Sequence, residues 1–171
     1  TDDGIQVALE GEHDDQATFD KVMLSVGRKP YTHGVGLENT DVRIDDDGFI
    51  EVDAQRRTAE ESIFAIGDVA GQPMLAHKAS HEARAAAEAA AGKQTEYDPR
   101  AVPFVVFSDP AIAWCGLSER DAEQQGRDVK VATFPSAASG RAATLSRKEG
   151  LTKVIANPRS GRVLGVGIAG Q

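Results

Sequence analysis

The sequence predicts an α/β segment followed by an α+β domain. A short apolar run at residues 63–66, rich in β-forming side chains, precedes a Gly-Asp pair and an alanine-rich helical stretch. This order is typical of a strand, buried on both faces, that leads into a helix. Residues 95–100 are polar, contain a proline and form the best domain boundary. Strand and helix signals then alternate, and a turn-rich stretch between two of the strands predicts a hairpin.

The first thirty residues predict two strands and the end of a domain. Residues 5–10 alternate apolar and polar side chains, with Ile5 and Leu9 on the same face. A polar turn at residues 11–16 precedes a second predicted strand at residues 19–26. Such a pair is too small to be a domain by itself. A further strand is predicted at residues 49–52, after a polar turn.

A glycine and an aspartate follow the buried strand at residues 63–66. Gly67 lets the backbone turn or approach another segment closely. Asp68 stands just past the carboxyl end of the strand, where ligands bind in open α/β sheets. A carboxylate there suits the hydroxyls of a ribose or ribityl chain. An ordinary strand–loop–helix with a solvated aspartate fits the same pattern.

The alanine-rich helix is predicted to begin between Met74 and Lys78, after Pro73, and Gly92 is placed to end it. The first N–H groups of a helix have no partner inside it and carry a partial positive charge. That end of the helix can therefore accept an anion or an electron-rich ring.

The second half predicts an α+β domain. Ser118 is placed to cap a helix that Gly126 ends, and Asp121, three residues after Ser118, imperfectly mimics a capping box. A turn at residues 157–162 joins two strands into an antiparallel hairpin. The predicted elements are strands at residues 102–107, 128–134, 151–156 and 163–168, and a helix at residues 119–125.

Composition and charge narrow the class of protein. The net charge is −8, with 27 acidic against 19 basic residues, which argues against nucleic acid as a partner. Ordinary solubility and adaptation to high salt both explain this acidity. No apolar run has transmembrane length, so no membrane is expected. The single cysteine, Cys115, excludes an internal disulfide and fits the reducing cytoplasm.

Two patterns resemble metal sites, but neither is complete. The run of acids at residues 45–47 before Gly48 would need further ligands near Arg43 and Ala54 to form a calcium loop, so a solvated turn is predicted. His77 and His81 have a spacing that holds metals, yet no third ligand is suitably placed. No metal site is therefore predicted.

Four motifs carry a resemblance that covers nearly the whole chain. They are Val26-Gly27-Arg28-Lys29-Pro30, Thr58 with Ile63-Phe64-Ala65-Ile66-Gly67-Asp68, Met74-Leu75-Ala76-His77-Lys78-Ala79, and Val102-Pro103-Phe104-Val105-Val106-Phe107-Ser108-Asp109-Pro110. In this order they resemble the FAD-dependent pyridine nucleotide–disulfide oxidoreductases. The third motif is similar to the members that oxidise dihydrolipoyl groups. Another FAD-dependent disulfide oxidoreductase, such as a glutathione or mercuric reductase, and a non-catalytic dimerisation or nucleotide-binding module remain alternatives.

The resemblance implies a Rossmann-like FAD/NAD(P)-binding segment followed by a dimerisation domain. Residues 1–30 would end the NAD-binding domain, residues 31–98 would form the second segment of the FAD-binding domain, and residues 99–171 would form the dimerisation domain. It also implies FAD and NAD as cofactors, a homodimer, and the lipoyl domain of a 2-oxo acid dehydrogenase complex as partner. The implied cofactor-binding residues are Gly27, Arg28, Gly67, Asp68, Met74, Leu75, Ala76 and His77.

The family's catalytic parts are expected outside this chain. Its redox step needs two cysteines, and only Cys115 is present. Its glycine-rich loops and its carboxyl-terminal His-Glu motif also have no counterpart here. The chain opens at Thr1 without a methionine, so it is expected to be an internal segment of a larger enzyme, with no catalytic residue and no turnover of its own.

Overall fold

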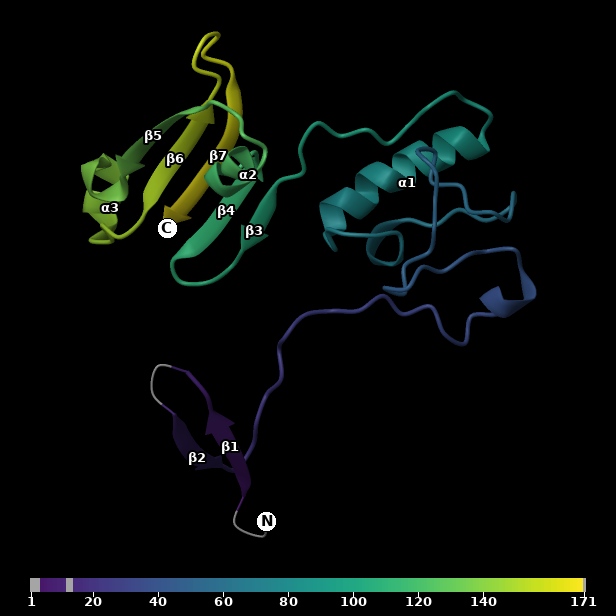
Figure 1. Ribbon diagram of the computed structural model, residues 1–171, viewed down its shortest axis with the longest axis horizontal. Coiled ribbons are helices and arrows are strands. Elements are labelled where there is room, and N and C mark those ends of the chain that lie inside the picture. Colours follow the sequence, from purple (N-terminus) through teal and green to yellow (C-terminus); the bar gives the residue numbers. More distant parts are fainter. Residues whose placement is uncertain (1–3, 12–13, 171) are drawn as a thin grey trace. The chain divides into compact units, whose positions relative to one another are not determined.

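The computed structural model describes residues 4–11 and 14–170, and the chain divides into two compact units, residues 1–31 and 32–171. Thr1 and part of the predicted turn at residues 11–16 lie outside the described residues. Figure 1 shows a two-stranded ribbon in the first unit, and a long helix and a five-stranded sheet in the second.

The first unit is an antiparallel ribbon of β1 (Ile5–Leu9) and β2 (Asp15–Phe19). The first predicted strand is confirmed, but the second, predicted at residues 19–26, was wrong. The observed strand ends where that prediction began. Met23, Leu24 and Val26 are 88%, 83% and 93% exposed. They have the composition of a strand, yet no strand of the described residues lies beside them to share hydrogen bonds.

Two other predicted strands are reduced to single bridges. The stretch at residues 49–52 contributes only the Ile44–Ile50 bridge, and the run at residues 63–66 only the Arg57–Phe64 bridge. Ile66 is exposed, so the prediction of a strand buried on both faces was wrong. An extended segment becomes a strand only when neighbours pair with it. No parallel neighbour is present in the described part of the chain.

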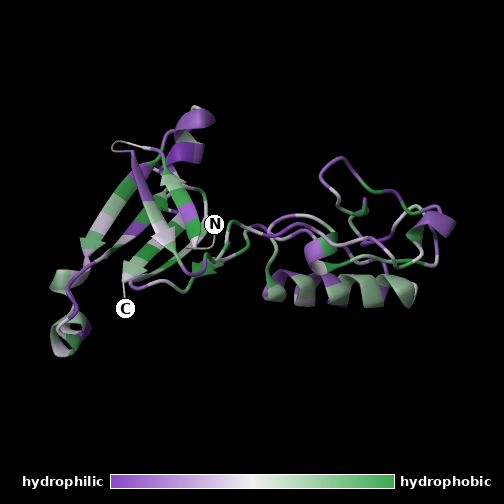
Figure 2. Ribbon diagram, turned by 90° about the horizontal axis from the view of Figure 1, so that it is seen from below, coloured by the Kyte–Doolittle hydropathy of each residue, from purple (hydrophilic) through white to green (hydrophobic). Residues whose placement is uncertain are grey.

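The long helix α1 (Ala76–Ala90) follows the sequence prediction closely. Its buried residues lie at positions i, i+4, i+7, i+8 and i+11, as one face of a helix requires: Lys78, Glu82, Ala85, Ala86 and Ala89. Gly92 ends the helix in the left-handed region, with φ of 82°. The Gly92 N–H donates to the carbonyl oxygen of Ala89 at 2.9 Å, and the Lys93 N–H donates to the carbonyl oxygen of Glu88 at 3.0 Å. These two bonds form a Schellman motif. Figure 2 shows the alanine-rich end of this helix as apolar.

The sheet has the order β3-β4-β7-β6-β5, and every neighbouring pair is antiparallel. The predicted hairpin is confirmed, with Leu151 opposite Ala169 and Lys153 opposite Gly167. Two elements, β4 and α3, were not predicted, because small residues hide the period of β4 and Gly140 weakens the helix signal of α3. The strands are β3 (Phe104–Val106), β4 (Ala111–Gly116), β5 (Lys130–Pro135), β6 (Leu151–Ala156) and β7 (Val163–Gly170), and the helices are α2 (Glu119–Gln124) and α3 (Gly140–Leu145). Three short 3-10 helices complete the fold: η1 (Leu37–Asn39), η2 (Gly67–Val69) and η3 (Ser136–Ala138).

The predicted capping box at the start of α2 is confirmed. The Ser118 hydroxyl accepts the Asp121 N–H at 3.1 Å, and the Asp121 carboxylate accepts the Ser118 N–H at 3.3 Å.

We expect Ser118→Ala to lower the free energy of unfolding by about 1 kcal/mol, because one orphan N–H of the helix loses its acceptor. Urea denaturation measures this loss. Ser80→Ala, the same change inside α1, is the control, and an equal loss there would contradict the capping argument.

Candidate functional site at the start of helix α1

The η2 turn packs directly against α1. Gly67 has φ of 75°, and a Cβ on it would lie 3.1 Å from the Cβ of Ala79. The predicted close approach is therefore present, and it is to the helix itself. Thr58 holds the segment that leads into the turn, because its hydroxyl bonds to the carbonyl oxygens of Ile63 at 2.9 Å and Glu60 at 3.0 Å. Asp68, the next residue of the turn, is half-buried.

A buried carboxylate locks this turn to the helix. Glu82 is 0% exposed, and its Oε2 accepts the Gly67 N–H at 2.7 Å. Its Oε1 lies 3.0 Å from both Lys78 Nζ and Arg56 Nη1. Lys78, 4% exposed, also donates to the carbonyl oxygens of Gly67 at 3.2 Å and Gly71 at 3.0 Å. The turn that carries Asp68 is thus tied to α1 through both its N–H and its C=O groups.

Arg56 reaches this cluster from a strained backbone position. Its φ is 66°, in the left-handed region that non-glycine residues seldom occupy. Its guanidinium carbon lies 5.1 Å from the centre of the Tyr97 ring, and its Nε is buried with no hydrogen-bond partner among the described residues. Burial, and then the negative charge of Glu82, raise the pKa of the Tyr97 hydroxyl. The cluster therefore places two cations and one anion beneath the turn. The net positive charge of these three groups favours a negatively charged group nearby.

The start of α1 is open to a ligand. No side chain caps the helix at Leu75, and the first bond from α1 back to Leu75 comes from Ala79. The N–H groups of the first turn are therefore left with their partial positive charge. Met74 is buried, Leu75 is half-buried, and Ala76 and His77 are exposed.

The imidazole of His77 has a structural partner. Its Nε2 lies 2.8 Å from the carbonyl oxygen of Pro103, so this nitrogen carries the proton and donates. This hydrogen bond joins the ring to the segment that leads into β3.

Six of the predicted cofactor-binding residues lie in one place, at the η2 turn and the start of α1: Gly67, Asp68, Met74, Leu75, Ala76 and His77. The other two, Gly27 and Arg28, lie in the first unit and are exposed, and Gly27 has φ of 121°. Their roles stay predictions.

The residues of the two patterns that resembled metal sites make other contacts in the structure. Asp45 Oδ1 accepts the N–H groups of Asp47 at 3.0 Å and Phe49 at 2.8 Å, which makes residues 45–49 a tight exposed turn. Within residues 4–11 and 14–170, no three His, Cys, Asp or Glu side chains gather closely enough to hold a metal ion. Glu82, the neighbour of His81, points into the core instead.

Sequence reasoning missed the cluster of Arg56, Lys78 and Glu82. A signal for part of it existed, because Lys78 and Glu82 stand four apart on the same helical stripe as the buried alanines. Arg56 gave no signal, since 26 residues separate it from Glu82.

The arrangement fits a ligand with a hydroxylated chain and an electron-rich planar ring. Asp68 supplies an acceptor for hydroxyl groups, and the uncapped helix start supplies N–H donors for the ring. The turn holds these two elements together because Glu82 and Lys78 fix it.

Comparison with known families assigns the chain. Residues 1–83 match the model described as pyridine nucleotide-disulphide oxidoreductase, and residues 102–171 match that described as pyridine nucleotide-disulphide oxidoreductase, dimerisation domain. The chain belongs to the pyridine nucleotide–disulfide oxidoreductase family. FAD and NAD are the cofactors of this family. The predicted FAD/NAD(P)-binding segment followed by a dimerisation domain is confirmed.

Similar members of the family are dihydrolipoyl dehydrogenases. The one from Haemophilus influenzae is 44% identical over 171 residues, which are 99% of this chain and 36% of that protein. The one from Halobacterium salinarum is 47% identical over 172 residues, with the same two shares. The chain thus spans little more than a third of the length of these relatives.

Solved structures of the family have the same fold. The HOCl-induced flavoprotein disulfide reductase RclA from Escherichia coli superposes with a TM-score of 0.84 at 29% identity, over 95% of this chain and 38% of that one. LpdA from Mycobacterium tuberculosis gives a TM-score of 0.86 at 24% identity, over 99% and 37%, and supports the fold alone. Among the described residues, no helix has both the length and the apolar character that crossing a membrane requires.

Proposed function

We propose that the chain is the flavin-ring and dimer-interface portion of a dihydrolipoyl dehydrogenase. Such an enzyme oxidises dihydrolipoyl groups through a redox cysteine pair and FAD, and it reduces NAD. The observation that carries the proposal is the Asp68 turn, which Glu82 fixes against the uncapped start of α1. The identities of 44% and 47% to dihydrolipoyl dehydrogenases support the substrate class.

Each predicted site residue has a role in this proposal. Asp68 accepts hydrogen bonds from the ribityl hydroxyls, and the backbone from Met74 to His77 faces the flavin ring. Gly27 approaches the dinucleotide, and Arg28 lies at the domain junction. Bound FAD supplies the electron transfer, while these residues hold and orient it. The acid–base and cysteine chemistry belongs to other parts of the enzyme.

The proposed domain limits follow the same assignment. Residues 1–30 end the NAD-binding domain, residues 31–98 form the second segment of the FAD-binding domain, and residues 99–171 belong to the dimerisation domain. The division of the chain into compact units after Tyr31 and the match of residues 102–171 to the dimerisation domain support these limits. The partners are a second copy of the enzyme and the lipoyl domain of a 2-oxo acid dehydrogenase complex. The single cysteine supports a cytoplasmic location.

A flavin titration tests the proposal. We expect the chain to bind riboflavin and FAD with comparable, weak affinity, because none of the assigned contacts is to the pyrophosphate. Asp68→Ala should weaken the binding of both about tenfold or more, since a charged acceptor is lost. Flavin absorbance and fluorescence measure the affinity. Asp46→Ala, at the exposed tip of the turn at residues 45–49, is the control. A chain that binds neither flavin, or equal affinities for the Asp68 variant and the unchanged chain, would refute the assignment.

A second candidate is a disulfide reductase of another branch of the family. The similarity to RclA, at 29% identity and a TM-score of 0.84, favours it. The two candidates share the flavin site and differ in the disulfide substrate, so the spacing of the cysteine pair in the whole enzyme discriminates between them.

A further inference from the structure

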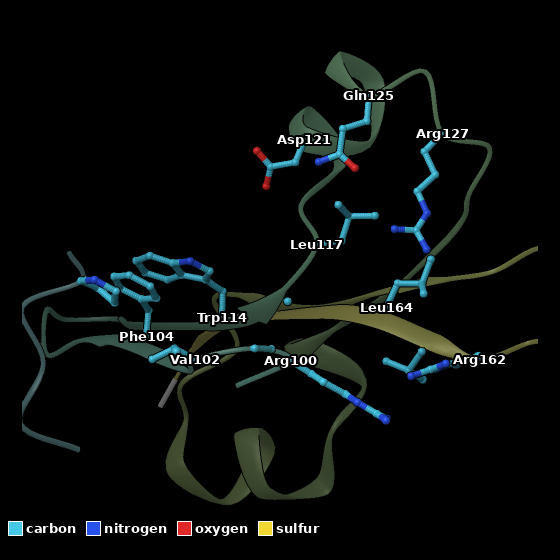
Figure 3. A pocket seen from close by; sticks show the side chains of 14 residues that line it. Arg100, Val102, Phe104, Trp114, Leu117, Asp121, Gln125, Arg127, Arg162 and Leu164 are labelled. Atoms are coloured by element: carbon cyan, nitrogen blue, oxygen red, sulfur yellow. The ribbon is translucent and has the colours of Figure 1, made fainter. Parts of the chain in front are cut away.

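A hollow of about 630 Å³ lies beside the sheet, between β4, α2 and the start of β7 (Figure 3). Three arginines from separate segments line it: Arg100 precedes β3, Arg127 follows α2, and Arg162 precedes β7. None of the six residues gathered at the flavin site is among the lining residues. Pro73, which precedes Met74, does line it, so the hollow adjoins the segment before α1 but uses none of the six residues of that site.

The three arginines are available for a ligand. All three are exposed, and within the described part of the chain their guanidinium groups form no ion pair and no hydrogen bond. Arg84 and Arg147, which lie elsewhere, pair with carboxylates. In a chain with net charge −8, three unpaired arginines around one hollow form a local positive site.

One carboxylate, that of Asp121, is present among the described lining residues. Hydrogen bonds from the hydroxyl and the backbone N–H of Ser118, at 2.6 Å and 3.3 Å, hold it at the start of α2. These bonds lower the pKa of Asp121, so it remains ionised at neutral pH. Three guanidinium groups against one carboxylate leave the lining with an excess of two positive charges.

The opposite end of the hollow is apolar and aromatic. The rings of Phe104 and Trp114 stack with their centres 4.7 Å apart and their planes at 9°. Figure 3 shows this pair at one end of the hollow and Arg127 and Arg162 at the other. The volume is within the range of small-molecule sites. The positively charged end suits the anionic groups of a ligand. The flat apolar end can in addition take an aromatic ring, if the ligand has one.

We propose that this hollow binds a small anion that carries two or more phosphate groups. Guanidinium groups match phosphate oxygens with paired, charge-assisted hydrogen bonds, and three of them suit a ligand with several such groups. Two sources share this chemistry: inorganic pyrophosphate, and a nucleoside diphosphate whose base lies against Trp114.

The single tryptophan makes the test specific. Trp114 is the one tryptophan of the chain, so its fluorescence reports on this hollow. We expect a saturable fluorescence change when the 171-residue chain is titrated with pyrophosphate or with ADP. Tighter binding of ADP identifies the nucleotide as the source, and equal binding identifies the phosphate groups alone. Arg127→Gln and Arg162→Gln should each weaken binding about tenfold, since each removes one charged donor.

A matched control separates the site from general charge attraction. Arg159→Gln removes an exposed arginine from the turn between β6 and β7, outside the hollow, and should leave the affinity unchanged. The proposal is overturned if neither anion gives a saturable change, or if Arg159→Gln weakens binding as much as Arg127→Gln. Far-UV circular dichroism establishes that the variants are folded. Asp68→Ala should leave phosphate binding intact, so failure of this site and failure of the flavin site are distinguishable.

Discussion

Replacing Glu82 with alanine is expected to lower the free energy of unfolding by about 3–5 kcal/mol, a large fraction of the stability of a small domain. The loss arises because Glu82 is 0% exposed and is the anion that Arg56 and Lys78 share. Without it, two cations and the Gly67 N–H remain in the core without their partner. Urea denaturation followed by circular dichroism measures the change.

The same helix offers a matched control for this prediction. Glu88 pairs with Arg84 at 3.3 Å, also four residues apart, but the Arg84 side chain is 81% exposed. Glu88→Ala should therefore lower the stability far less than Glu82→Ala, because water screens an exposed ion pair. Glu82→Gln keeps an acceptor for Gly67 and should fall between the two. Equal losses for Glu82→Ala and Glu88→Ala would show that the buried cluster does not hold the turn.

Local chemistry explains which elements could be predicted. The capping box at Ser118 and Asp121 and the glycine at Gly92 act within one or two helical turns, and each was predicted from the sequence. The hairpin of β6 and β7 is likewise set by the six-residue turn that joins the two strands. In all three cases the residues that decide the structure are neighbours in the sequence.

The wrong strand predictions share one physical cause. Residues 20–26, 49–52 and 63–66 have the composition of strands, but among the described residues they form at most single bridges and join no sheet. Strand propensity reflects a pleated, half-buried surface rather than an intrinsic backbone preference. Such segments form strands only when the sheet around them is present, and composition alone cannot supply that information.

The residues of the candidate site also differ in whether local sequence patterns predict them. Asp68 and the start of α1 could be predicted, because a glycine-aspartate pair before an alanine-rich helix is a local pattern. The contact of Arg56 with Glu82 joins residues 26 positions apart and depends on the left-handed backbone of Arg56. The sequence thus points to the residues proposed to meet the ligand, while the residues that hold them in place emerge only from the structure.

Gly165→Ala is expected to lower the free energy of unfolding by about 3 kcal/mol or more. A Cβ at Gly165 would lie 1.9 Å from the carbonyl oxygen of Leu117, a backbone atom that cannot rotate away. Gly165 faces Gly116 across β4 and β7, and a Cβ at Gly116 would lie 2.3 Å from the carbonyl oxygen of Leu164. The chain leaves β4 for α2 at this crossing, and the Leu117 N–H bonds to Leu164 O at 2.9 Å.

Two residues further along β7, Gly167 provides the control. It has no heavy atom within 4 Å of the position that a Cβ would take, and its φ lies outside the left-handed region. Gly167→Ala should therefore be neutral or stabilising by a few tenths of a kcal/mol, since alanine restricts the unfolded chain. Thermal unfolding of the two variants shows whether the loss comes from a clash at position 165 or from any side chain added to β7. If both variants lose the same stability, the close crossing of β4 and β7 is not what requires a glycine at position 165, and the strands separate there at little cost.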